Sequence, residues 1–175
     1  MAELICALTQ DYSFGCDTGA GGVAKEAYII EEDNVDSVTE SSGTITAITK
    51  APGKIFRKYQ LVQETALAEE TMTGNVQNGT LFYAQKFNIV LNRQQVAVRN
   101  EILLLAKARI AVVVQDNNGE WRYFGRDQGL KLSTGVATTG TAWGDRNEYT
   151  LEFTGNEREL APFVLPEVIP TLQAA

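Results

Sequence analysis

The 175-residue sequence contains no histidine and only two cysteines, Cys6 and Cys16. Without histidine the chain lacks the commonest general base, and every Ser–His or Cys–His nucleophilic arrangement is excluded. Two cysteines without histidine cannot form a usual structural zinc site. In a chain that we expect to be cytoplasmic at synthesis, free thiols are favoured over a Cys6–Cys16 disulfide, which stays an alternative.

Long apolar runs and an excess of positive charge are also missing. No run approaches the ~18–20 residues that span a bilayer, and the N-terminus lacks the basic and apolar regions of a secretory signal. We therefore expect synthesis in a cytoplasm and no membrane partner. Fifteen Lys and Arg against 22 Asp and Glu give a net charge of −7. Such a surface repels nucleic acid, so DNA could pass the protein without specific binding.

Two glycine- or asparagine-rich segments resemble ligand loops only superficially. Gly19–Gly22 lacks the Lys-Ser/Thr of a phosphate-binding loop and the strand–loop–helix context of a dinucleotide site. Asp116–Asn118, before Gly119, lacks the twelve-residue calcium pattern with its terminal glutamate. We interpret the first as a strand connection and the second as a hairpin turn, and we expect no cofactor and no metal.

Carboxylates and aromatic side chains offer two further hypotheses. The acidic groups 31–33 and 69–70 could act as paired carboxylates of a glycosidase, but adjacent carboxylates in loops are usually only solvated. Trp121, Tyr123 and Trp143 could form a platform on which a sugar stacks, although a core or interface role is favoured for them. We therefore expect no enzymatic activity, and a carbohydrate-binding β-sandwich remains an alternative.

Short β-branched and aromatic segments separated by turn residues predict a mainly β fold, an antiparallel β-sandwich or barrel, in one domain over residues 1–160. Segments 66–79 and 132–146 are predicted to be long loops, whose small residues suit backbone contacts with another copy. The expected strands are 4–9, 26–31, parts of 35–49 and 54–65, 80–91, 110–115, 120–125 and 148–154.

One amphipathic α-helix is predicted over Arg93–Ala108 and is expected to pack on the sheet. Asn92 is a suitable N-cap, and Gln95 three residues later completes a pair resembling a capping box. The apolar stripe of this helix comprises Val98, Ile102 and Leu105.

The C-terminal residues 161–175 are apolar and rich in proline, which prevents an uninterrupted helix. We expect an extended arm that leaves the domain and docks on an adjacent subunit, with packing on its own domain as the alternative. A symmetric ring would also close the open edges of the sheets. The predicted assembly interface consists of Phe163, Val164, Leu165, Val168, Ile169 and Leu172.

Four phrases carry a resemblance to a known family: "GGVAKEAYI" near the start, "NGTLFYAQKFNIVL" before the helix, "VVVQDNNGEWRYFG", and "GDRNEYTLEFTGNE". With the element order, they resemble the tail tube proteins of long-tailed bacteriophages and, more distantly, the tube of type VI secretion systems. The resemblance implies a β-barrel-like subunit with a flanking helix and no catalytic residues.

The resemblance further implies a virion protein, assembled in the bacterial host cytoplasm as stacked hexameric rings that conduct DNA. Its partners would be other copies of itself and other tail proteins. The proline-rich C-terminal arm has no counterpart in the family's pattern. Another virion component, such as a head–tail connector, a tail terminator or a capsid decoration protein, is therefore the alternative.

Overall fold

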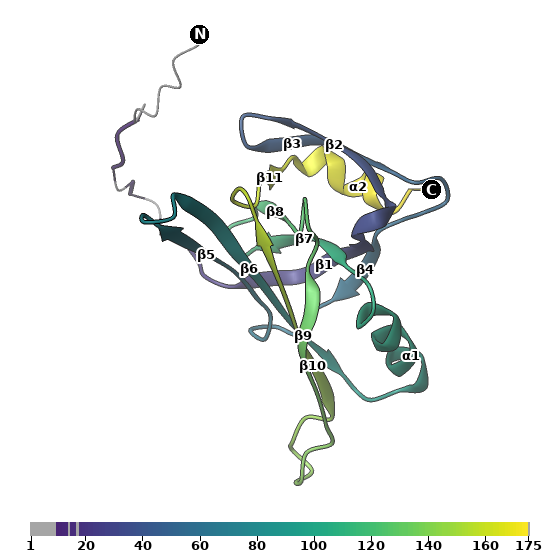
Figure 1. Cartoon of the computed structure of the whole chain (residues 1–175). Helices are drawn as coiled ribbons and strands as arrows, with labels where there is room; N and C mark the ends of the chain where they lie inside the picture. Colours follow the sequence, from purple (N-terminus) through teal and green to yellow (C-terminus); the bar gives the residue numbers. More distant parts are fainter. Residues whose placement is uncertain (1–9, 14, 17, 175) are drawn as a thin grey trace.

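A computed structural model describes residues 10–13, 15–16 and 18–174 and places them in a mainly β fold with two sheets (Figure 1). The predicted strand 4–9 and Cys6 lie outside these residues, and Cys16 is an exposed free thiol. The strands are β1 (Val23–Glu31), β2 (Val35–Ser41), β3 (Thr44–Lys50), β4 (Arg57–Gln60), β5 (Leu67–Asn75), β6 (Thr80–Asn92), β7 (Ile110–Asp116), β8 (Trp121–Phe124), β9 (Lys131–Thr138), β10 (Glu148–Glu157) and β11 (Phe163–Val164).

The larger sheet has seven strands in the order β2-β3-β11-β8-β7-β1-β4. The buried runs 27–30 of β1 and 110–114 of β7 are apolar without interruption, because both faces of the sheet are covered at these positions. Successive side chains of a strand point to opposite faces. Ile29 and Val112 therefore enter one core, whereas Tyr28 and Val113 enter another.

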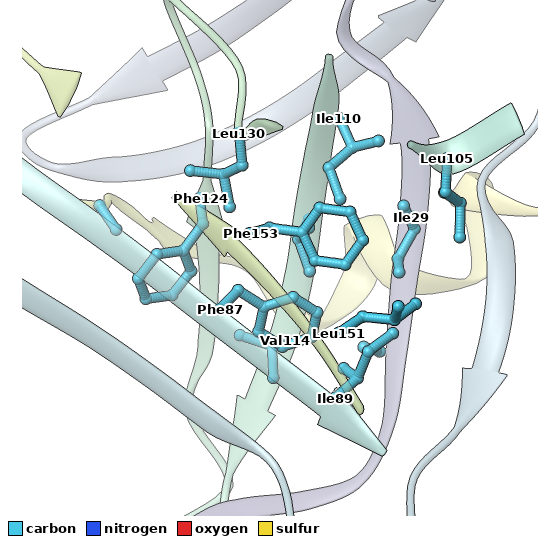
Figure 2. Packing of buried hydrophobic residues seen from close by; sticks show 13 residues of the cluster. Ile29, Phe87, Ile89, Leu105, Ile110, Val114, Phe124, Leu130, Leu151 and Phe153 are labelled. Atoms are coloured by element: carbon cyan, nitrogen blue, oxygen red, sulfur yellow. The ribbon is translucent and has the colours of Figure 1, made fainter. Parts of the chain in front are cut away.

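The first core lies between the two sheets (Figure 2). The smaller sheet is antiparallel, in the order β5-β6-β10-β9, and its inward side chains include Phe87 and Ile89 of β6 and Leu151 and Phe153 of β10. Phe87 and Phe153 are direct cross-strand partners and both are fully buried. The prediction of a mainly β fold is thus confirmed, with two sheets that share a core.

The second core contains the C-terminal segment, which corrects the prediction of an arm that leaves the domain. β11 inserts between β3 and β8, and Val164, Val168 and Leu172 are only 3%, 4% and 0% exposed. The segment is also not fully extended, since Pro166–Val168 forms a 3-10 turn and Ile169–Leu172 a short helix, α2. The two prolines at these helix starts occupy positions where a missing N–H is harmless. Burial in its own core removes the reason for docking elsewhere.

The predicted helix exists but is shorter and less buried than expected. Helix α1 spans Val96–Leu105, and Asn92 remains in strand β6, so Gln95 is the N-cap without a side-chain hydrogen bond. Of the predicted stripe only Leu105 is buried, while Val98 and Ile102 are half-buried. Val96, Leu103 and Leu104 are exposed, so α1 contacts the core mainly through its C-terminal end.

The two predicted long loops prove to be strands over residues 67–75 and 132–138, whereas residues 76–79 and 139–146 are connections as predicted. Residues 67–75 form β5 and residues 131–138 form β9, the two outer strands of the four-stranded sheet. Their threonines are β-branched and suit a strand that is exposed on one face, whereas their glycines and acidic residues had suggested loops. Turn 76–79 then joins β5 to β6, with Gly79 at a φ of 62°.

Candidate assembly surface

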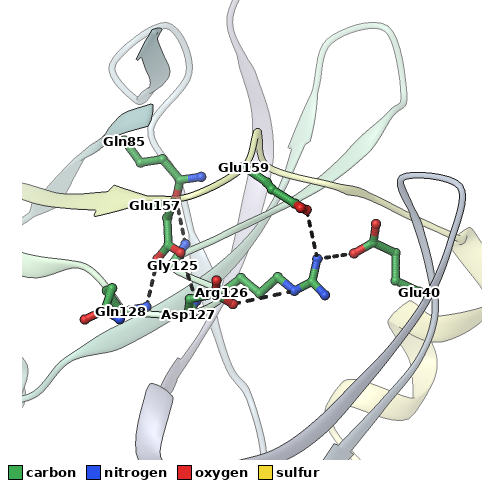
Figure 3. Close-up of polar contacts among 8 residues, drawn as sticks. All are labelled: Glu40, Gln85, Gly125, Arg126, Asp127, Gln128, Glu157 and Glu159. Atoms are coloured by element: carbon green, nitrogen blue, oxygen red, sulfur yellow. Dashed lines mark hydrogen bonds and ion pairs between the residues drawn. The ribbon is translucent and has the colours of Figure 1, made fainter. Parts of the chain in front are cut away.

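A polar network closes the end of the inter-sheet core (Figure 3). Gln85 and Glu157 are 2% and 4% exposed, although both lie on strands that otherwise bury apolar side chains. The Gln85 side-chain oxygen accepts a hydrogen bond from the Gly125 amide at 2.8 Å. The two Glu157 oxygens accept from the amides of Asp127 and Gln128 at 3.0 and 3.1 Å. The network therefore fixes the turn after β8 against the four-stranded sheet.

Glu157 shares with many catalytic carboxyl groups only a raised pKa. Burial raises its pKa, and the two backbone amides oppose that effect by stabilising the carboxylate. Both of its oxygens are occupied by backbone donors, and the side chain has no exposed approach for a substrate. The arrangement can anchor a turn but offers no group for proton transfer.

Glu70 joins the same region to the C-terminal segment. One of its oxygens accepts from the Gln85 side-chain amide at 2.9 Å and from the Ala161 amide at 2.7 Å. The other oxygen pairs with Arg122, whose guanidinium lies over the rings of Phe124 and Phe163. Glu70 is thus a buried structural partner rather than one of two solvated loop carboxylates.

Sequence patterns could have located only part of this network. Gln85 stands in the inward series of β6 with Phe87 and Ile89, so a buried amide was detectable in the alternation. Glu157 follows the turn-like Gly155-Asn156, which suggested that β10 had already ended at that point. The glycine instead permits close packing, because a Cβ at Gly155 would lie 2.6 Å from the Gly129 carbonyl oxygen.

The structure does not assemble the other predicted sites. Glu31 ends β1, and Glu32 and Asp33 form a short 3-10 turn, whereas Glu69 lies on the outward face of β5. Trp121 and Tyr123 are buried in the second core, and Trp121 packs against Tyr28 at 5.8 Å between ring centroids. Trp143 lies instead in the exposed connection between β9 and β10. No common platform for a sugar results from these positions.

The outward face of the four-stranded sheet is polar and rich in threonine. Lys86 and Glu152 form an ion pair at 2.7 Å across β6 and β10, and Ser133 donates to Glu152 at 3.0 Å. The lysine and the hydroxyl lower the pKa of Glu152, and the carboxylate raises that of Lys86. This face therefore presents opposite charges that already neutralise each other.

Both edges of the four-stranded sheet are open among the described residues. β5 pairs only with β6, and β9 only with β10. Unpaired edge strands bind other strands readily unless the protein covers or blocks them. Large exposed apolar side chains lie on these two edge strands: Leu67 and Met72 on β5 and Val136 on β9. The edges are the strongest candidate for an assembly surface.

An ordered connection, residues 139–147, follows β9 at one end of the sheet, and we name it the Trp143 loop (Figure 1). One Asp145 oxygen accepts from the amides of Thr141 and Ala142, both at 2.7 Å, and these bonds lower the pKa of Asp145. The Arg93 amide donates to the Asn147 carbonyl at 2.6 Å. Trp143 is fully exposed at 107% of its reference area.

In comparisons with protein-family models, curated proteins and solved structures, nothing matches this chain. Within the described residues, no helix is both long enough and apolar enough to cross a membrane.

Proposed function

We propose that this protein is a virion structural protein that forms rings of a bacteriophage tail tube, joined through the four-stranded sheet. The edge strand β9 of one copy pairs with β5 of the next, and the sheets together form one closed barrel. The observation that carries this proposal is the pair of open, complementary edges on a single antiparallel sheet. The resemblance in sequence supplies the class of assembly.

Strand direction is compatible with a ring. Neighbouring strands alternate in direction across β5-β6-β10-β9, so the two edge strands run in opposite directions. Continuing the sheet from β9 to the next copy's β5 by rotation keeps every pair antiparallel. Such a head-to-tail contact uses two different surfaces and repeats until the ring closes.

Charge favours the same pairing. The exposed part of β5 and the connection before it carry Glu64 and Glu69 and no cation, whereas β9 carries Lys131 and no anion. Pairing two β5 strands would bring carboxylates together, and like charges on facing strands are destabilising. Pairing β5 with β9 avoids that repulsion.

The offset between the edges matches a closed barrel. Within one copy, a row of cross-strand partners leads from Thr134 in the middle of β9, through Glu152 and Asn88, to Leu67, the first residue of β5. The middle of β5, Thr71, lies four residues further on, about 14 Å at ~3.4 Å per residue. Four strand spacings of ~4.8 Å span about 19 Å, so the sheets would join at a tilt of about 36°. Strands in closed barrels tilt by ~35–45°.

In such a barrel the polar outward face lines the lumen, because the other face is covered by the seven-stranded sheet. Threonine hydroxyls and the Lys86–Glu152 pair give this wall little attraction for phosphate. The net charge of −7 acts in the same direction. DNA would therefore pass without being held.

Sedimentation and negative-stain imaging of the concentrated protein test the proposal, and rings or tubes are expected. Two proline variants test the edge, Val136→Pro and Ala137→Pro, because successive amides of a strand point to opposite sides. One variant disrupts pairing with β10 and loses the fold, whereas the other stays folded by circular dichroism and forms no rings. A wild-type protein that stays monomeric at high concentration refutes the proposal. Single rings that never stack would favour a terminator or connector over a tube.

A further inference from the structure

The Trp143 loop and an apolar groove beside β5 form a second contact between copies. We propose that Trp143 of one copy inserts into this groove on the adjacent copy. The inference rests on the proposed ring and specifies one contact within it that edge pairing alone does not require.

The groove lies between β4, the connection before β5, and helix α1. It has a volume of about 650 Å³, and its apolar lining is supplied by Tyr59, Leu61, Val62, Leu91 and Val98. The first residue of β5, Leu67, pairs with Asn88, so β6 continues beyond the start of β5 and Leu91 has a strand on one side only. The groove is therefore located next to the beginning of the β5 edge.

The proposed register brings the Trp143 loop to that place. β9 runs antiparallel to the next copy's β5, so the end of β9 at Thr138 meets the start of β5 at Leu67. The Trp143 loop begins immediately after Thr138. The groove is formed in part by Leu61 and Val62, in the connection that leads to Leu67. Loop and groove are thus adjacent once the edges have joined.

The chemistry of the two surfaces is complementary. Trp143 presents an indole that no described residue of its own chain covers. The groove presents aliphatic side chains and a tyrosine, beside the polar Lys58, Gln60, Asn92 and Glu101. At the rim, Arg146 of the loop would face Glu64 of the next copy's connection, and both side chains are exposed. A tryptophan buries ~150–250 Å², about a quarter of the ~800 Å² that each partner buries in a specific interface.

The loop is also arranged in advance. Asp145 holds two of its amides, and Asn147 accepts from the Arg93 amide and, through its side chain, from the Gln94 amide at 3.3 Å. A loop that is already ordered loses little conformational freedom on binding. An exposed tryptophan on such a loop has the properties of an interface hot spot, where truncation costs at least ~30-fold in affinity.

The test compares the assembly of wild type, Trp143→Ala and Val76→Ala by sedimentation over a concentration series. Val76 is a matched control, since it is 98% exposed at the turn of the other hairpin, β5–β6. We expect Trp143→Ala to need at least ~30-fold more protein for half-assembly, and Val76→Ala to behave as wild type. A groove variant, Val62→Asp, should match Trp143→Ala while keeping the circular dichroism of the wild type.

Tryptophan fluorescence gives an independent measurement, because Trp121 is already buried and Trp143 is the only other tryptophan. Assembly should shift the emission to shorter wavelength and protect it from acrylamide, and Trp143→Ala should abolish the change. If wild type and Trp143→Ala assemble alike and Trp143 stays accessible, the inference is wrong while the ring survives. A shift caused by soluble oligosaccharides in dilute protein would assign Trp143 to a glycan and also overturn it. If wild type never assembles, both proposals fail.

Discussion

Replacing Leu172 by alanine tests whether the C-terminal segment belongs to the domain that precedes it. Leu172 is fully buried in the second core, in the four-residue helix α2, and its carbonyl accepts from the Phe56 amide at 2.9 Å. A matched control is Phe163→Ala, because Phe163 lies in the same segment but is 45% exposed.

The expected loss follows from the burial of the side chain. Removing a leucine side chain from a packed core costs ~2–5 kcal/mol, and the higher values apply where the cavity cannot collapse. Neighbouring strands β1, β3 and β8 are fixed by sheet pairing, so the second core around Leu172 has little freedom to relax. For the mid-range values, ~3.5 kcal/mol lost from a total stability of ~10 kcal/mol, about a third of the stability would be lost. Phe163→Ala should cost only about 1 kcal/mol through its contact with Arg122.

Urea and thermal unfolding of dilute protein provide the measurement, since dilution removes any contribution from assembly. For a chain of this size, ~2–5 kcal/mol corresponds to a fall in Tm of roughly 5–20 °C. Truncation after Leu160 should leave no cooperative unfolding transition at all. If Leu172→Ala keeps the stability of dilute protein and weakens only assembly, then the segment docks on a neighbour and the packing described above is not the one in solution.

Three further predictions concern the polar network, the turn after β8 and the C-terminal turn. Burial raises the pKa of Glu157 above about 4.5, so the folded state retains the carboxyl proton to higher pH than the unfolded chain, and the free energy of unfolding falls as pH rises through that window. Urea titrations from pH 4 to 7 should show this fall in wild type relative to Glu157→Gln. Parallel pH dependences of the two proteins would refute it. Gly125→Ala should lower the free energy of unfolding by at least ~2 kcal/mol, because Gly125 has a φ of 73° and a Cβ there would lie 2.6 Å from a backbone oxygen. Gly119→Ala, where the added Cβ would meet open space, should lower it by only ~1–2 kcal/mol. Equal Tm values for the two variants would contradict the predicted clash at Gly125. The Lys50 ammonium donates to three carbonyl oxygens of the C-terminal turn. Lys50→Met should therefore lower the free energy of unfolding by ~1–3 kcal/mol and speed digestion by carboxypeptidase. An unchanged rate of digestion would show that these hydrogen bonds do not hold the C-terminal turn in place.

Much of the sheet core was predictable because burial on both faces leaves an unmistakable composition. The run "IAVVV" of β7 contains no polar residue, and the structure buries all five of its side chains. Alternation in β6 likewise identified the inward positions Phe87 and Ile89. The strands β6 and β7 could be predicted from local sequence because the side chains that face the core are apolar at regular positions.

The exposed edges could not be recognised by the same reasoning. β5, with the sequence "LAEETMTGN", has no apolar alternation, since its outward face meets solvent and one inward position, Glu70, belongs to the polar network. The length and the burial of helix α1 were overestimated for a related reason. Val96 and Leu103 look like core residues in a helical period, yet α1 contacts the core only through its last turn.

The C-terminal segment was misjudged because its partners are distant in sequence. β11 has two residues and no strand signal of its own, and its pairing with Thr44–Ile45 and Trp121–Arg122 becomes apparent only in three dimensions. Proline-rich apolar segments look unpartnered in sequence. In the fold, the segment fills a gap between two strands that would otherwise not be joined.

That insertion has a consequence for the order in which the protein is made. β11 connects β3 to β8, so the seven-stranded sheet stays divided into a β2–β3 hairpin and a β8-β7-β1-β4 sheet until β11 is available. During translation the ribosome adds β11 after all the other described strands, at ~5–20 residues per second. A nascent chain that still lacks β11 and α2 would therefore expose the second core and be open to proteolysis, whereas a chain that contains them can bury it. Synthesis of this two-residue strand is therefore a condition for closing the seven-stranded sheet.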